Sequence, residues 1–192
     1  MAARIKGASL ITTIGIMREV LGVARFQEIV ARCPVPTQNL LRRTLIALEW
    51  VPLDQWAPFL QAIHEHICHR DDPQFRRLMR AVCKRDFSTL YRSYVNQSSP
   101  KSILDKADSI WSSYFDSGSL TLLPGPPEEK PQQLTLQMRN LETSFPVYAV
   151  TMHAYLEQLM VMAGAKSCTV QREHESLQDG KLSCDFVINF GP

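Results

Sequence analysis

The chain has 192 residues, of which 45% are hydrophobic and 21% are charged, and its formal net charge is +2. This length and composition indicate one globular domain and exclude a disordered chain, which would show a charge excess or few apolar residues. The small net charge gives no reason to expect a nucleic acid as partner.

No run of about 20 apolar residues is present, so we expect no integral membrane segment. Residues 1–7 also lack the charged-then-apolar order of a signal peptide. The cysteines are odd in number, widely spaced and without a Cys-x-x-Cys pair: Cys33, Cys68, Cys83, Cys168 and Cys184. This pattern is typical of reduced thiols rather than of a disulfide framework, and we expect a cytoplasmic protein.

Helical spacing of apolar residues begins near the N-terminus. It predicts a helix over residues 8–21 that Gly22 ends, a second over 23–33, and a third over 40–48 after Pro34 and Pro36 break the chain. A fourth helix, over residues 56–67, should end at the turn Asp71-Asp72-Pro73.

Residues 74–96 keep helical spacing throughout and predict the longest helix of the chain. Ser99 and Pro100 are a cap and a first helical residue, and the helix that they begin should end at Gly118. Residues 119–123 and 132–138 then predict two strands, joined by an exposed and mobile proline-rich hairpin loop at 124–131.

A last helix should begin after Phe145 and Pro146 and end at Gly164. Strict alternation predicts strands over 168–172 and 182–190, with the turn at Asp179 and Gly180. The order of these elements predicts a single α+β domain over residues 1–192, in which a helical layer packs on a small antiparallel sheet.

Short motifs in a fixed order carry a resemblance over nearly the whole chain. They are Ile5-Lys6-Gly7, Trp50-Val51-Pro52, Asp86-Phe87-Ser88-Thr89-Leu90-Tyr91, Ser99-Pro100, Trp111-Ser112-Ser113-Tyr114-Phe115-Asp116-Ser117-Gly118, and Gly180 followed by Cys184-Asp185-Phe186. The chain resembles uncharacterised myxobacterial proteins related to the heme-NO-binding, 4-vinyl-reductase and TRAPP-subunit superfamily. The resemblance implies a curved sheet, an apolar cavity or a dimer surface, and a role in sensing ligands or assembling complexes. It implies no enzymatic activity.

Two departures from that superfamily limit what the resemblance implies. Its heme-binding members have a Tyr-x-Ser-x-Arg motif and a proximal histidine, whereas residues 91–95 here read Tyr-Arg-Ser-Tyr-Val. We therefore expect neither heme nor another cofactor. Related ligand-binding domains also carry a second cysteine where this chain has Leu177, which argues against a paired-thiol role for Cys184.

The run from His64 to His69 is the most suggestive local chemistry in the sequence. His64 and Cys68 are four residues apart and should share one helical face, where they could share a metal ion. No second group of ligands completes a tetrahedral site, and histidines at a helix end are often solvated. We expect no metal site.

Two surfaces are candidates for binding. Arg76, Arg80 and Lys84 recur every four residues and could meet an acidic protein partner, although a solvated helix face explains them as well. Residues expected to line an apolar ligand pocket are Phe87, Tyr91, Trp111 and Tyr155. On the last helix Tyr148, Met152, Tyr155, Met160 and Met162 could also line a pocket, but core packing explains them equally well.

No nucleophile with its base, no carboxylate pair and no phosphate-binding loop stands out, so we expect no enzyme. A hydrolase or transferase using His64, His66 or His153 is the least supported hypothesis. The leading hypothesis is a self-associating interaction or regulatory module in a cytoplasmic complex, with a protein partner or a second copy of the chain. The alternative is a sensor that holds an apolar small molecule between helices and sheet.

Overall fold

Four antiparallel strands in the C-terminal half form the main sheet, in the order β3-β4-β6-β5. The computed structural model describes residues 3–89, 91–96, 99–124 and 133–191. The strands are β3 (Ser119–Leu122), β4 (Gln133–Glu142), β5 (Ser167–Gln178) and β6 (Lys181–Gly191). Both predicted hairpins are confirmed, since β3 pairs with β4 and β5 with β6. The predicted loop at 124–131 lies, apart from its first residue, outside the described residues.

The helices of the N-terminal half are α1 (Gly7–Arg32), α2 (Val35–Arg42), α3 (Leu53–Ala62), a π-helical turn η1 (Ile63–Ile67) and α4 (Asp72–Ser88). After them come α5 (Arg92–Val95), α6 (Pro100–Asp105), α7 (Ala107–Tyr114) and α8 (Val147–Met162). Two short strands, β1 (Arg4–Lys6) and β2 (Trp50–Pro52), pair antiparallel beside the helices.

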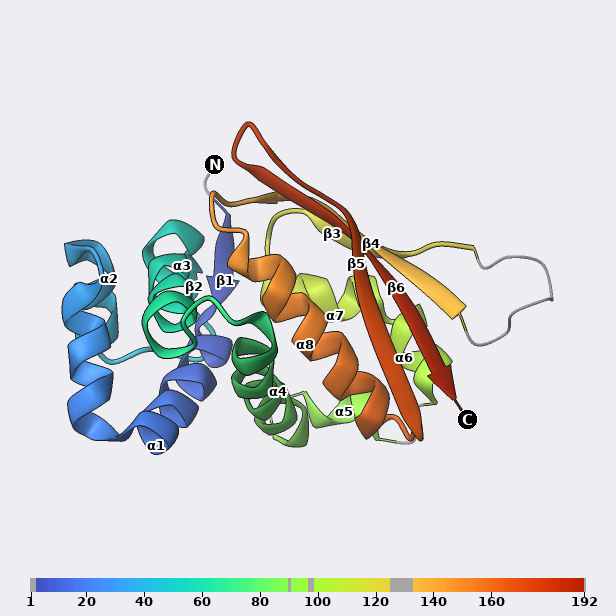
Figure 1. The fold of residues 1–192 in the computed structure, drawn as a ribbon, viewed down its shortest axis with the longest axis horizontal. Helices are drawn as coiled ribbons and strands as arrows, with labels where there is room; N and C mark the ends of the chain where they lie inside the picture. The colour runs from blue at the N-terminus through green and yellow to red at the C-terminus, as the bar shows by residue number, and fades with distance from the viewer. Residues whose placement is uncertain (1–2, 90, 97–98, 125–132, 192) are drawn as a thin grey trace.

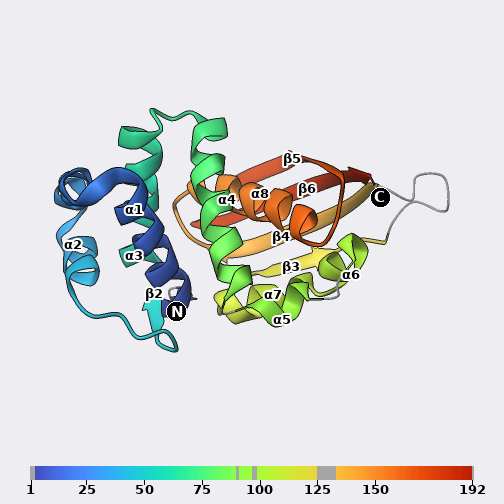
Figure 2. The ribbon, with the colours of Figure 1, turned by 90° about the horizontal axis from the view of Figure 1, so that it is seen from below.

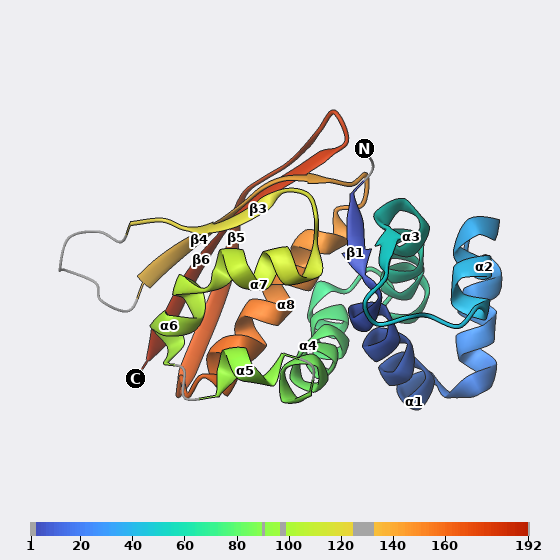
Figure 3. The same cartoon turned by 180° about the vertical axis from the view of Figure 1, so that it is seen from behind.

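The helices gather on one side of the twisted main sheet. Helix α8 runs along β5 and β6, with α4 beside it (Figures 1 and 2). Seen from behind, α6 and α7 lie against the β3 side of the sheet, while α1, α2 and α3 form a group farther from it (Figure 3). The expected α+β single domain, a helical layer on an antiparallel sheet, is confirmed.

Alternation along the strands directs one set of side chains towards the helices. Leu136 of β4 pairs with Phe186 of β6, and Val170 of β5 pairs with Ile188; all four are buried. The Asp179-Gly180 turn has positive φ at both residues, as a tight hairpin requires. The sheet therefore supplies one apolar face, and the core runs from it through all the main helices.

Helix α1 contains the break expected at Gly22, whose φ of 73° and ψ of 162° are not helical, so two helices meet there at a kink. Of the helices that the structure describes, α1 alone is long and apolar enough to cross a membrane by length and composition. Half of that apolar window is buried inside the protein.

The prediction of a helix over 40–48 was wrong. Helix α2 begins earlier, with Pro36 in its first turn, and it ends at Arg42. Beyond it the Glu49 carboxylate accepts hydrogen bonds from the Arg43 guanidinium, at 2.8 and 2.9 Å, and from the Ile46 amide, at 2.8 Å. These bonds hold residues 43–49 in a non-helical conformation that leads into β2.

The prediction of one long helix over 74–96 was also wrong. Helix α4 ends at Ser88, since Thr89 leaves the helical region with φ −122° and ψ −90°. The Thr89 hydroxyl donates to the Arg85 carbonyl oxygen at 2.7 Å, which competes with continuation of the helix. Tyr91 still packs against the core after this turn, so the apolar spacing continues where the helix does not.

Candidate functional site: an apolar cavity between helices and sheet

A cavity lies between the helices and the β3–β4 side of the sheet. About 50 Å³ of it is open to the centres of water-sized molecules. Residues from six helices and three strands line it: Ile5, Ser9, Thr13, Trp56, Leu60, Met79, Ile103, Leu104, Ala107, Ile110, Trp111, Tyr114, Phe115, Leu120, Leu136, Tyr148, Thr151, Met152, Tyr155, Leu156 and Leu159. A single water needs roughly 10–15 Å³ of such space, so the cavity has room for a small molecule.

Aromatic rings form one wall of the cavity. The rings of Trp111 and Phe115 lie 4.5 Å apart between centroids, and the Phe115 ring meets that of Tyr148 edge to face at 6.0 Å. The Trp111 indole nitrogen donates to the Ser117 carbonyl oxygen at 3.0 Å, outside the cavity lining. This wall therefore offers ring surface and not a free donor from Trp111.

The hydroxyl of Tyr148 differs from the other tyrosine and threonine hydroxyls of this mostly apolar lining. Tyr148 is 1% exposed, and its hydroxyl has no hydrogen-bond partner among the described residues. Burial also raises the pKa of Tyr148 well above its ordinary value, so the hydroxyl keeps its proton. Buried polar groups are nearly always paired, and an unpaired one in a cavity wall points to a missing partner.

The two threonines of the lining are already satisfied. The Thr13 hydroxyl donates to the Ser9 carbonyl oxygen at 2.8 Å, and the Thr151 hydroxyl donates to the Val147 carbonyl oxygen at 2.9 Å. Both bonds stay within one helix turn, so these side chains present mainly their methyl groups to the cavity.

Two further tyrosines of the lining share one buried carboxyl group. The hydroxyls of Tyr114 and Tyr155 donate to Oδ2 of Asp86, at 3.1 and 3.0 Å. Asp86 is fully buried near the end of α4. Burial raises its pKa to about 6, although the side chains of Thr12, Tyr155 and Tyr114 offset part of that rise.

Two of the four residues predicted to line a pocket border the cavity and two do not. Trp111 and Tyr155 line the cavity, whereas Phe87 and Tyr91 do not. These two lie behind Tyr114, whose ring stacks at 4.5 Å on Tyr91 and at 6.2 Å on Phe87. Tyr114 was missed as a lining residue, although it follows Trp111 by three positions on the same helical face.

Only some of the methionine and aromatic residues of α8 that could line a pocket do line the cavity. Tyr148, Met152 and Tyr155 line the cavity. Met160 is fully buried in the core, and Met162 is partly buried against it. Spacings of four and three residues place Tyr148, Met152 and Tyr155 on one face of α8. Met162 shares that face near the end of the helix, so spacing alone does not distinguish it from the lining residues.

Of the three basic residues on α4 that could meet a protein partner, Arg76 and Arg80 contact α8. Arg76 and Arg80 form ion pairs of 2.9 and 3.2 Å with the Glu157 carboxylate of α8, and His153 also contacts Arg76 and Glu157. Lys84 is exposed. Burial alone would raise the pKa of Glu157, but the hydrogen bond from His153 and the nearby guanidinium groups lower it overall. A role for these three residues in partner binding stays a prediction.

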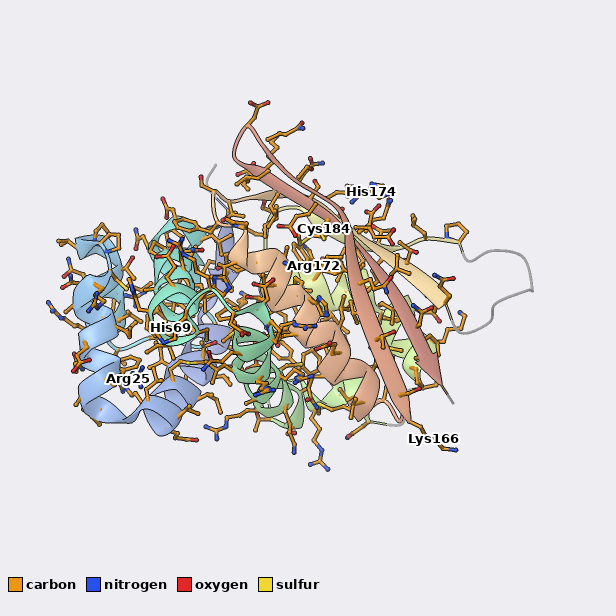
Figure 4. All side chains as sticks on the ribbon, viewed as in Figure 1. Arg25, His69, Lys166, Arg172, His174 and Cys184 are labelled. Carbon is orange, nitrogen blue, oxygen red and sulfur yellow. The ribbon has the colours of Figure 1, made fainter. Side chains whose placement is uncertain are left out.

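His64 is used in a different contact from the one considered for it in the sequence. Its Nε2 lies 2.9 Å from the Asp72 carboxylate, which also pairs with Arg172 of β5. Figure 4 shows Arg172 between its strand and the helices. Within the part of the chain that the structure describes, no group of three or more His, Cys, Asp or Glu side chains is placed to hold a metal ion.

The lining of the cavity does not fit heme. Among the described residues around it there is no histidine and no cysteine, so a proximal histidine like that of the heme-binding relatives is lacking. The open space of about 50 Å³ is also far too small for a tetrapyrrole, because the packed rings of Trp111, Phe115 and Tyr148 occupy much of the space between the helices and the sheet. Within its described residues, this lining offers a metal ion no imidazole or thiolate ligand.

No protein-family model matches the sequence, and no curated protein matches it. Solved structures do match the fold. A Cs H-NOX mutant matches with a TM-score of 0.71 at 14% identity, covering 97% of each chain. A mutant of an H-NOX protein from K. algicida, in its unliganded Fe(II) form, matches with a TM-score of 0.70 at 10% identity, again covering 97% of each chain.

A third match is an oxygen-binding H-NOX domain related to soluble guanylate cyclases, solved as its oxygen complex. It has a TM-score of 0.68 and 14% identity, and the match covers 97% of this chain and 95% of that one. Likeness at such low identity shows the fold and not the ligand. Nearly the whole chain therefore has an H-NOX-like fold.

Proposed function

We propose that this chain is a non-catalytic sensor domain that holds a small, mostly apolar molecule in the cavity between its helices and its sheet. The observation that carries the proposal is the unpaired Tyr148 hydroxyl in an apolar, aromatic wall. Ligand sites are typically apolar with a few polar groups that fix orientation, and this cavity has that character.

The H-NOX-like fold supports a ligand-binding role, since one of the matched structures is an oxygen-binding domain in its oxygen complex. The same likeness favours the sensor over the self-associating interaction module. Self-association, a protein partner, a cytoplasmic location and membership of the myxobacterial family all stay predictions. The ligand of this chain is proposed to occupy the cavity without heme, because the open space of about 50 Å³ is too small for a tetrapyrrole and the described lining has no histidine or cysteine.

Titration with ethylbenzene, followed by NMR of the isoleucine and leucine methyl groups, tests the proposal. The methyl groups of Ile103, Leu104, Leu136 and Leu156 line the cavity and should shift together with saturation. Shifts that are scattered over the surface, or that do not saturate, would show that the cavity is not a binding site.

A cavity-filling variant makes the test specific. Ala107 lines the cavity and is 5% exposed, so Ala107→Leu should fill the space and abolish the methyl shifts. Ala163 is similarly buried, at 8% exposure, but is not among the lining residues. Ala163→Leu is therefore the matched control, and it should bind ethylbenzene as the wild type does.

A further inference from the structure

The carboxyl group of Asp86 is fully buried and does not line the cavity, but it binds two tyrosines that do. One of its oxygens, Oδ2, accepts hydrogen bonds from both Tyr114 and Tyr155. The three residues come from three helices, α4, α7 and α8, so the carboxyl group sits where these helices meet.

Tyr114 and Tyr155 line the cavity, but their hydroxyl groups donate to Asp86. The rings meet edge to face with centroids 6.1 Å apart. Stacking of Tyr91 on Tyr114 at 4.5 Å further limits how that ring can turn. Because both hydroxyls are bonded to Asp86, the cavity receives ring surface from these residues and no hydrogen-bond donor.

A cavity with three tyrosines would otherwise be markedly polar. Tyr114, Tyr148 and Tyr155 could each offer a hydroxyl, and an unpaired buried hydroxyl is costly, so it binds any acceptor within reach. In this structure two of the three are satisfied by one carboxyl oxygen, and the Tyr148 hydroxyl alone of the three has no partner among the described residues.

We infer that Asp86 is a specificity-determining residue. By holding the Tyr114 and Tyr155 hydroxyls, it makes the cavity favour apolar ligands over ligands that carry hydrogen-bond acceptors. This inference rests on the proposed function, since it concerns the selectivity of the same cavity. Asp86 acts through the two tyrosines and does not itself contact the ligand space.

Two probes of nearly the same shape test the inference, ethylbenzene and acetophenone, which differ mainly in one carbonyl oxygen. Asp86→Leu removes the acceptor and releases the two hydroxyls, which should then donate to the ketone. We expect the ratio of acetophenone to ethylbenzene affinity, from methyl NMR titrations, to rise about three- to tenfold. Asp86→Asn keeps an acceptor oxygen and should leave the ratio within about twofold of wild type.

A purely structural role for Asp86 predicts a different result. If Asp86→Leu weakens both probes by the same factor, or leaves their ratio unchanged, the inference is wrong while ligand binding in the cavity stands. If the wild type binds neither probe, the proposed function itself fails, and the inference fails with it.

Tyr155→Phe gives a second test that does not require removal of the buried carboxyl group. With Asp86 in place the Tyr155 hydroxyl should not reach the ligand, so the affinity ratio should stay within about twofold of wild type. A fall of about threefold or more in the ratio would show that this hydroxyl already binds the ketone, which contradicts the assigned role of Asp86.

Discussion

The hydroxyl of Tyr155 on α8 donates a 3.0 Å hydrogen bond to Oδ2 of Asp86 on α4, 69 residues earlier in the chain. Helix α8 lies on the main sheet, whereas α4 borders the N-terminal helices (Figure 2). This bond therefore joins the two parts of the fold at the edge of the cavity, with a group whose charge depends on pH.

The raised pKa of Asp86, about 6, makes stability depend on pH. A carboxyl group whose pKa is higher in the folded than in the unfolded chain stabilises the fold when protonated, so its contribution is present at low pH. We expect this contribution to be lost as pH rises from about 4 to about 6, by up to about 3 kcal/mol in the free energy of unfolding.

Denaturant unfolding of the wild type and of Asp86→Asn between about pH 4 and about pH 7 measures this effect. This range includes the ordinary pKa of an aspartate, 3.8, at its lower end and the pKa of about 6 of Asp86 in the folded chain. Because asparagine does not titrate, the difference in unfolding free energy between the variant and the wild type should change over that range. A constant difference would show that Asp86 does not titrate there.

Glu157 should stabilise the contact between α4 and α8. It is 16% exposed in its side chain and pairs with two arginines of α4. We expect Glu157→Gln to lower the free energy of unfolding at pH 7 by about 1–3 kcal/mol, since Arg76 would lose its carboxylate partner. Asp105→Asn is the control, because its pair with Lys101 is exposed and should contribute less than about 0.5 kcal/mol.

Gly118 and Gly180 have the same φ of +70° but different surroundings. A Cβ at Gly118 would lie 2.8 Å from the Arg139 carbonyl oxygen, whereas one at Gly180 would meet nothing within 4 Å. We expect Gly180→Ala to cost about 1 kcal/mol from backbone strain and Gly118→Ala at least about 2 kcal/mol in thermal or denaturant unfolding. Equal costs would show that the backbone contact at Gly118 relaxes freely.

All five cysteines should react slowly with thiol reagents in the folded protein. Burial raises the pKa of Cys33, Cys68 and Cys168 to about 11, and it raises that of Cys83 well above its usual range. Cys168 is the most accessible of the five, so it should be alkylated first at neutral pH. Mass spectrometry after short iodoacetamide exposure gives the order, and rapid modification of Cys83 would contradict the buried position of that thiol.

Tyr148 should bind the acceptor of a ligand directly. We expect Tyr148→Phe to weaken acetophenone binding about three- to tenfold, because a hydrogen bond is lost, while ethylbenzene binding stays the same within about twofold. Methyl NMR titration of both probes measures this difference. Equal losses for the two probes would assign Tyr148 a packing role only.

The sequence was sufficient for elements with a clear period. Strict alternation over 182–190 predicted β6, and the Asp179-Gly180 turn predicted its pairing with β5. It was insufficient where tertiary contacts decide: the turn at Thr89 interrupts a continuous helical pattern, and β1 and β2 have only three residues each, too few to show a period.

The candidate site could be predicted only in part, for a physical reason. Apolar spacing shows which residues are buried, and Trp111 and Tyr155 were found in that way. It does not show which buried side chains border empty space and which pack against other rings, as Phe87 and Tyr91 do behind Tyr114. The roles of Asp86 and Tyr148 depend on hydrogen bonds between residues far apart in the chain, or on their absence.

Native mass spectrometry of the wild type and of Ala107→Leu, both purified from the cells that make the protein, tests the central claim most directly. The wild type should retain a small organic molecule, and the variant, whose cavity is filled, should not. A wild type without added mass, a heme, or the same bound mass on both proteins would contradict a metal-free ligand site in this cavity.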